Sequence, residues 1–161
     1  MALPLAPAVA ARAGSGIAIG GIIGGRFGGG GDELLAISEV PDYPQSERAE
    51  ALASAAYFSV LSLEPAKGID RAQAALAMIP EAALPGAERT ALAALALGTM
   101  ATGSATEALA YARKARTYDV EFRSMEGVTF ALIAMLCNDL PGARQAVQDD
   151  LIALAGYANE G

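Results

Sequence analysis

The chain has 161 residues, of which 53% are hydrophobic and 6% aromatic, and its 11 basic and 18 acidic side chains give a net charge of −7. This length is typical of one domain, and the acidic balance argues against nucleic-acid binding because it repels phosphate backbones. The sequence contains no histidine, which excludes Ser-His-Asp and Cys-His catalysis and histidine-ligated zinc.

Residues 1–31 form an apolar segment rich in glycine and isoleucine, with two arginines and no acidic residue. If the segment is helical, glycines at every fourth position make a flat face against which another helix packs closely. The residues expected to make this helix-packing or membrane contact are Gly16, Gly20, Gly24, Gly28, Ile19 and Ile23. The pattern resembles the glycine-zipper segments of membrane-inserting and pore-forming proteins, and of some proteins that phages eject from the virion.

Three interpretations of this segment stay open: a membrane-embedded helix, a flexible arm, or an arm ordered only within an assembly. The uncharged run between Arg12 and Arg26 has 13 residues, fewer than the roughly 20 needed to cross a bilayer. Glycine also disfavours an isolated helix by about 1 kcal/mol per residue relative to alanine. In each interpretation, the glycine run at 28–31 is predicted to be a hinge.

Residues 32–45 are predicted to be a linker with a short helix over 32–40, and residues 46–161 a helical domain. Asp70 is a candidate N-cap, Ser104 and Glu107 fit a capping box, and Pro141 suits a first helical turn. Punctuation by proline and glycine predicts six helices in this domain, over 46–63, 70–79, 87–101, 104–118, 122–137 and 141–157. We therefore expect an all-α fold of three antiparallel helical hairpins behind a Gly-rich N-terminal extension.

The clearest hairpin covers residues 89–122, with Ala96 and Ala108 on its two helices and Gly103 at the turn. It resembles the tetratricopeptide repeat, a 34-residue helical hairpin with small residues where the helices cross. Two further units extend the resemblance over about residues 53–157. The unit at 124–157 has Asn138 at the turn. The unit at 53–86 has Val60 and Ala72 at the positions of the small residues. The pattern is degenerate, with departures at Thr99, Val120, Ala134 and Asp150. The resemblance implies a right-handed array; a plain helical bundle is the alternative.

The resemblance also implies an inner groove that would bind a partner. Its predicted lining is Tyr57, Leu61, Ala93, Leu97, Met100, Val128, Leu132 and Met135. Such an apolar, methionine-containing surface suits an apolar helix or hydrophobic peptide, as in the tetratricopeptide chaperones of secretion systems. The alternative is that these side chains are core. A linked hypothesis is that the groove shelters the chain's own Gly/Ile segment.

The remaining polar residues indicate no catalytic, metal or cofactor site. Cys137 lies in an apolar run and is expected to be a small buried hydrophobe. Asp149 and Asp150 are adjacent, so on a helix they point about 100° apart and share no site. The basic cluster of Arg113, Lys114 and Arg116 falls near a helix C-terminus, where it complements the helix dipole.

The expected function is a non-enzymatic protein–protein interaction module, an adaptor, scaffold or chaperone-like protein, that is an oligomer or a complex subunit. Residues 1–31 are expected to dock it to a membrane or an assembly, rather than leave it free in the cytoplasm. The alternatives are a structural subunit of a membrane complex, secretion apparatus or virion, and a membrane-penetrating glycine-zipper protein.

Overall fold

The computed structural model describes residues 29–79, 84–118 and 126–159, and its regular structure over these ranges is entirely α-helical. The helices are α2 (Gly29–Ser38), α3 (Gln45–Leu61), α4 (Pro65–Met78), α5 (Pro85–Ala101), α6 (Ala105–Ala115), α7 (Glu126–Leu136) and α8 (Leu140–Asn159). The all-α prediction is confirmed for this part of the chain. The residues predicted to form the glycine pattern up to Gly28 lie outside the described ranges.

Two predicted helix caps are wrong. Helix α4 begins at Pro65, whose missing N–H is no loss in a first turn, so Asp70 lies inside the helix. Ser104 precedes α6 but makes no side-chain cap. Its backbone N–H already donates to Thr99, and the reciprocal bond from Glu107 is therefore not available. Pro141 is the second residue of α8, in the first turn as predicted.

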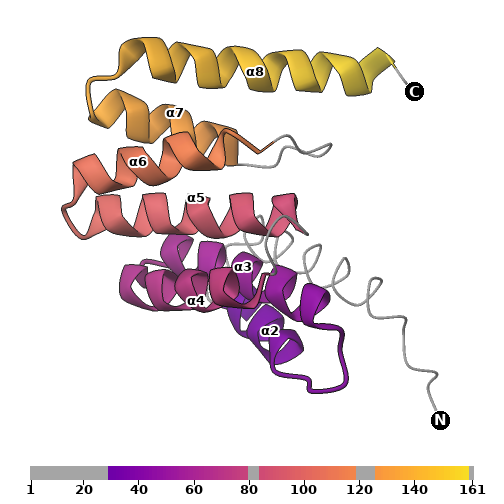
Figure 1. Cartoon of the computed structure of the whole chain (residues 1–161). Coiled ribbons are helices and arrows are strands. Elements are labelled where there is room, and N and C mark those ends of the chain that lie inside the picture. The colour runs from indigo at the N-terminus through magenta and orange to yellow at the C-terminus, as the bar shows by residue number, and fades with distance from the viewer. Residues whose placement is uncertain (1–28, 80–83, 119–125, 160–161) are drawn as a thin grey trace.

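Consecutive helices pair into three hairpins, α3–α4, α5–α6 and α7–α8, which stack in chain order (Figure 1). The first helix of each following hairpin lies against both helices of the one before, because α5 contacts α3 and α4, and α7 contacts α5 and α6. Among the described helices, the backbone of α2 packs closely against α3 alone, and the backbone of α8 against α7 alone. Helices α2 and α8 therefore lie at opposite ends of the stack.

The segment predicted as a hinge and linker is part of the packed body. Residues 29–31 form the first turn of α2, so the hinge prediction is wrong for these glycines. Leu34 is buried against Ala55 and Phe58 of α3, and this burial holds the helix in place. The short amphipathic run after the glycines provides that apolar contact, which favours the helix over an open chain.

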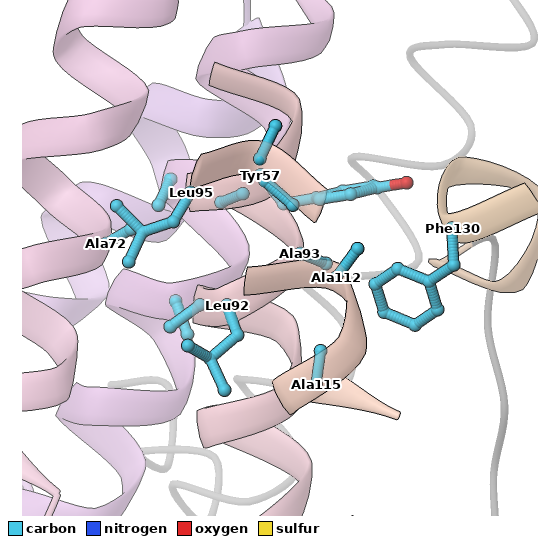
Figure 2. Packing of buried hydrophobic residues seen from close by; sticks show 14 of the residues in the cluster. Tyr57, Ala72, Leu92, Ala93, Leu95, Ala112, Ala115 and Phe130 are labelled. Atoms are coloured by element: carbon cyan, nitrogen blue, oxygen red, sulfur yellow. The ribbon is translucent and has the colours of Figure 1, made fainter. Parts of the chain in front are cut away.

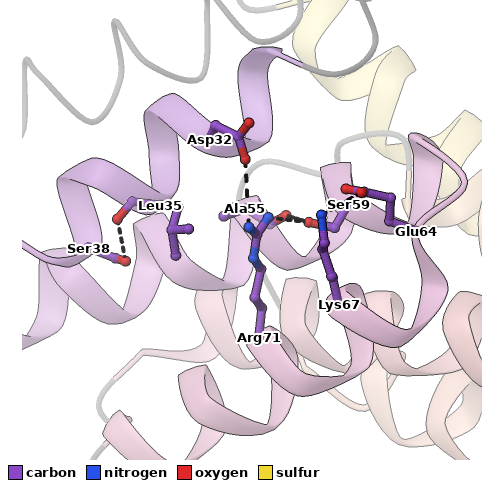
Figure 3. A network of polar contacts seen from close by, with 8 residues as sticks. All are labelled: Asp32, Leu35, Ser38, Ala55, Ser59, Glu64, Lys67 and Arg71. Atoms are coloured by element: carbon purple, nitrogen blue, oxygen red, sulfur yellow. Dashed lines mark hydrogen bonds and ion pairs between the residues drawn. The ribbon is translucent and has the colours of Figure 1, made fainter.

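A polar contact reinforces this docking (Figure 3). Arg71 on α4 lies 3.6 Å from the Asp32 carboxylate of α2 and donates a hydrogen bond of 2.5 Å to Ser59 on α3. The Ser59 hydroxyl in turn donates to the carbonyl of Ala55. One arginine thus connects three helices, although the exposed carboxylate makes the ion pair itself a small contribution to stability.

The three hairpin turns share one backbone geometry. Leu63, Gly103 and Asn138 have φ angles of 66°, 99° and 59°. In each turn this residue donates its N–H to the carbonyl three positions back, and the next residue donates to the carbonyl five positions back. This is the Schellman motif, which satisfies the last carbonyls of the first helix and reverses the chain.

Small residues occupy the helix crossing of each hairpin. When the hairpins are aligned by their turn residues, each has a small residue seven positions before the turn and another five positions after it. These buried pairs are Ala56 and Gly68, Ala96 and Ala108, and Ala131 and Ala143. A Cβ on Gly68 would lie 2.2 Å from Val60 Cγ2 and 3.0 Å from the Ala56 carbonyl. Glycine therefore allows the close approach of α4 to α3. The predicted unit at 53–86 is four residues out of this register, because it places Val60 and Ala72 where the structure has Ala56 and Gly68.

Alanine dominates the core between the hairpins, with a few large side chains between the alanines (Figure 2). Tyr57 of α3 is 6% exposed, and its hydroxyl shares a hydrogen bond of 2.6 Å with the Thr129 hydroxyl of α7. The Arg89 guanidinium lies 5.3 Å from the centre of the Phe130 ring, a cation–π distance. These contacts connect helices far apart in sequence, so the hairpins share one core.

Candidate interaction surface

The structure buries or half-buries some of the predicted groove residues and exposes the others to solvent. Tyr57 and Ala93 are buried in the core, and Leu61 and Met100 are half-buried against it; Leu97 is also half-buried. Val128, Leu132 and Met135, all on α7, are exposed. The first two hairpins thus use most of their predicted groove residues for packing, and the open apolar surface lies on the last hairpin.

The exposed residues of α7 continue onto α8, which the sequence analysis did not single out. We call the combined surface the terminal face: Val128, Leu132, Met135, Leu136, Leu140, Val147, Leu151 and Ile152. These side chains are between 47% and 72% exposed. Their spacing of three and four along each helix puts them on neighbouring turns of one side. The same spacing along 140–152 was readable in the sequence, but it is equally typical of a core-facing helix.

A shallow groove of about 330 Å³ runs between the two helices of this face. It is lined by Ala131, Met135, Leu140, Ala143, Arg144, Val147 and Gln148. The two alanines are the crossing residues of the hairpin, and their small side chains make the floor of the groove. Its edge carries one charged side chain, Arg144.

The other two hairpins have the equivalent surface covered. Nine positions after each turn residue stand Ala72, Ala112 and Val147, which are 0%, 2% and 48% exposed. In Figure 2, Leu95 of α5 lies beside Ala72, and Phe130 of α7 lies beside Ala112. Each hairpin thus receives the first helix of the next one. Within the described residues, no helix follows to cover the third.

Charged side chains near the face are engaged in ion pairs that hold the hairpins together. Arg113 of α6 pairs with Asp139 at 2.9 Å, and Arg116 pairs with Asp149 at 2.5 Å. The hydrogen bond from Arg113, and a backbone one from Gly142, lower the pKa of Asp139. Arg113 and Arg116 of the predicted basic cluster therefore bind the last hairpin, in addition to lying near a helix C-terminus.

A second polar contact lies between α5 and α6. The Tyr118 hydroxyl donates a hydrogen bond to the Glu88 carboxylate. This bond, with smaller contributions from burial and from the negative charge of Glu88, raises the pKa of Tyr118 to about 12. Lys114 also lies 4.0 Å from Glu88. The arrangement stabilises the protonated phenol and so gives no nucleophile or base at neutral pH.

The described part of the chain offers little for metal or covalent chemistry. Over 29–79, 84–118 and 126–159, no group of histidine, cysteine and acidic side chains is placed to hold a metal ion. Cys137 is half-buried, and its Sγ lies 3.4 Å from the carbonyl of Ala105. None of the helices described has the length and apolar character to cross a membrane.

Comparison with known proteins adds no relative: no family model, curated protein or solved structure matches this chain.

Proposed function

We propose that this chain is a non-enzymatic protein–protein interaction module, built from three tetratricopeptide-like hairpins, whose terminal face binds an apolar surface of a partner. The observation that carries the proposal is the exposure of Val147, where the equivalent Ala72 and Ala112 are covered by the next hairpin. An apolar surface of this extent on a soluble domain is typical of an interaction site.

Two features support the repeat interpretation. The turns at Leu63, Gly103 and Asn138 have the same hydrogen-bond pattern, and each hairpin has buried small residues 12 positions apart on its two helices. Each hairpin contacts the next through its first helix. Stacked helical repeats are built in this way, and a terminal repeat normally needs a polar outer surface to remain soluble. The last hairpin instead exposes the eight large apolar side chains of the terminal face.

The size of the terminal face indicates what a partner has to cover. Fully burying one large aliphatic side chain contributes about 1.5–3 kcal/mol, so covering eight that are between 47% and 72% exposed contributes roughly 10 kcal/mol. Association costs of about 4–15 kcal/mol oppose this. A partner that covers only α7 or only α8 would therefore bind weakly, and the partner has to contact both helices.

The proposal extends to residues 1–31 as the docking arm for a membrane or an assembly. Helix α2 is anchored to α3 by Leu34 and to α4 through Arg71. The start of α2 at Gly29 is therefore held at the end of the stack opposite to α8. A docking arm that precedes α2 suits an adaptor, which holds one partner while its terminal face engages another.

A peptide-binding experiment tests the terminal face. The probe is a fluorescently labelled amphipathic helix with leucines on one side and glutamines on the other, followed by anisotropy. We expect Leu132→Glu to weaken binding at least tenfold, because it buries a charge in an apolar contact. The matched control is Leu63→Glu, the same substitution at a leucine outside the face that is 90% exposed. Equal binding by both variants would contradict the proposal.

Flotation with liposomes tests the docking arm. The full chain is compared with one that begins at Asp32. Flotation of the full chain alone supports membrane docking, whereas a full chain that stays unbound but sediments as a defined complex supports an assembly arm. If neither behaviour depends on residues 1–31, the docking role is wrong.

A further inference from the structure

We infer that the occupant of the terminal face is the same face of a second copy of this chain, so that two stacks join end to end about a twofold axis. The inference rests on the proposed function, because it assigns the partner of the proposed surface. It is argued from the size of the face, its self-complementary shape and charge, and the covered state of the opposite end of the stack.

The area suits a dimer. At roughly 100 Å² of apolar surface per fully buried aliphatic side chain, the eight partly exposed residues present roughly 500 Å² in each copy. Two copies face to face would bury roughly 1,000 Å² of apolar surface, which is the lower limit for a specific interface before polar neighbours are added. A single short peptide would leave part of this surface exposed to water.

The shape and charge of the face also fit a copy of itself. Val147 and Leu151 are exposed one turn apart on α8 and so form an i, i+4 ridge. Val147 also lines the groove whose floor is Ala131 and Ala143. A twofold axis between two antiparallel hairpins places the ridge of each copy near the groove of the other. Charge is nearly absent, since Arg144 is the one charged residue that lines the groove; depletion of charge at the centre is typical of an interface core.

A head-to-tail contact would need an apolar surface at the other end of the stack. That end is covered by α2, where Asp32 is exposed, and Glu39, also exposed, directly follows the helix. The two ends are therefore not complementary. A heterologous contact that does not close into a ring would also leave a free apolar face at one end of every open chain, whereas the twofold contact closes after two copies.

The chain's own Gly/Ile segment, residues 1–31, is the alternative occupant of the terminal face. A chain whose face was covered by this segment would stay monomeric.

The test is the oligomeric state of the full chain, measured by sedimentation velocity over a dilution series up to roughly 100 µM. We expect a monomer–dimer equilibrium. Leu151→Glu on α8 and Met135→Glu on α7 should each raise the dissociation constant at least tenfold, and Leu63→Glu should leave it unchanged. All substituted side chains are exposed, so unchanged circular dichroism spectra confirm that the variants fold.

A wild-type chain that stays monomeric over this range overturns the inference. So does a dimer that both face variants leave intact, which would assign self-association to residues 1–31 or to another surface. In either case, loss of helical-peptide binding in Leu132→Glu would still support the interaction module with a different partner. The two measurements therefore distinguish an error in the dimer inference from an error in the proposed interaction function.

Discussion

Replacing Leu63 with glycine is expected to stabilise the protein. Leu63 has a φ of 66° and ends α3 in the same turn geometry that Gly103 and Asn138 provide in the other hairpins. A side chain with a Cβ in this left-handed region costs roughly 1–2 kcal/mol, whereas glycine adopts it freely. The leucine side chain is 90% exposed, so its removal sacrifices almost no packing.

The net effect follows from two opposing contributions. Relief of the backbone conformation favours the folded state by roughly 1–2 kcal/mol, and the greater freedom of glycine in the unfolded chain opposes this by about 0.4–1 kcal/mol. We expect a net gain of about 0.5–1 kcal/mol, or roughly 1–4 °C in melting temperature for a chain of this size. Urea and thermal unfolding followed by circular dichroism measure it.

The reverse substitution is the control. Gly103 has a φ of 99°, with no atom near enough to obstruct a Cβ, so Gly103→Ala tests the backbone alone and should lose about 1–2 kcal/mol. Leu63→Asn, which also tolerates this conformation, should match or exceed the glycine variant. If Leu63→Gly lowers the stability while Gly103→Ala is neutral, the assignment of a shared turn geometry is refuted.

Three further predictions concern polar contacts. Tyr57→Phe removes the buried hydrogen bond to Thr129 and should lower the free energy of unfolding by about 0.5–1.5 kcal/mol; an unchanged urea midpoint would contradict the contact between α3 and α7. Glu88→Gln should lower the pKa of Tyr118 from about 12 toward 10.0, as measured by ultraviolet titration of the phenol. In the wild type, the stability from this raised pKa is complete below pH 10.0 and lost as the pH rises through about 12. The lowered pKa of Asp139 has the opposite pH dependence. Its contribution to the free energy of unfolding is complete above pH 3.8 and is lost as the pH falls through the lowered pKa of the folded state. Asp139→Asn should reduce this loss of stability at acid pH, as measured by the urea midpoint over a series of pH values.

The helices were largely predictable because proline and glycine mark their ends. Pro141 and Gly103 lie where the sequence analysis placed them, at a helix start and a turn. The end of the helix at residue 63 was predicted, but the left-handed conformation of Leu63 was not predictable, since leucine is rare at positive φ. Without that turn, the first hairpin was placed four residues out of register, and Gly68 was not recognised as a crossing residue.

The interaction surface was only half predictable. Periodicity identifies an apolar side of a helix, but core and exposed sides look the same in the sequence. Tyr57 and Val128 were assigned to one groove, yet the first is in the core and the second in solvent. The difference depends on whether another hairpin follows in the chain, and no single helix contains that information.

The stacking order also has a consequence for dynamics. Among the described helices, α8 packs its backbone closely against α7 alone, whereas α5 is enclosed by helices of all three hairpins. Local opening should therefore begin at α8, with amide protons exchanging fastest there and slowest in α5. A partner on the terminal face would then also slow the fraying of the last hairpin, and its binding energy would appear partly as increased rigidity at that end of the protein.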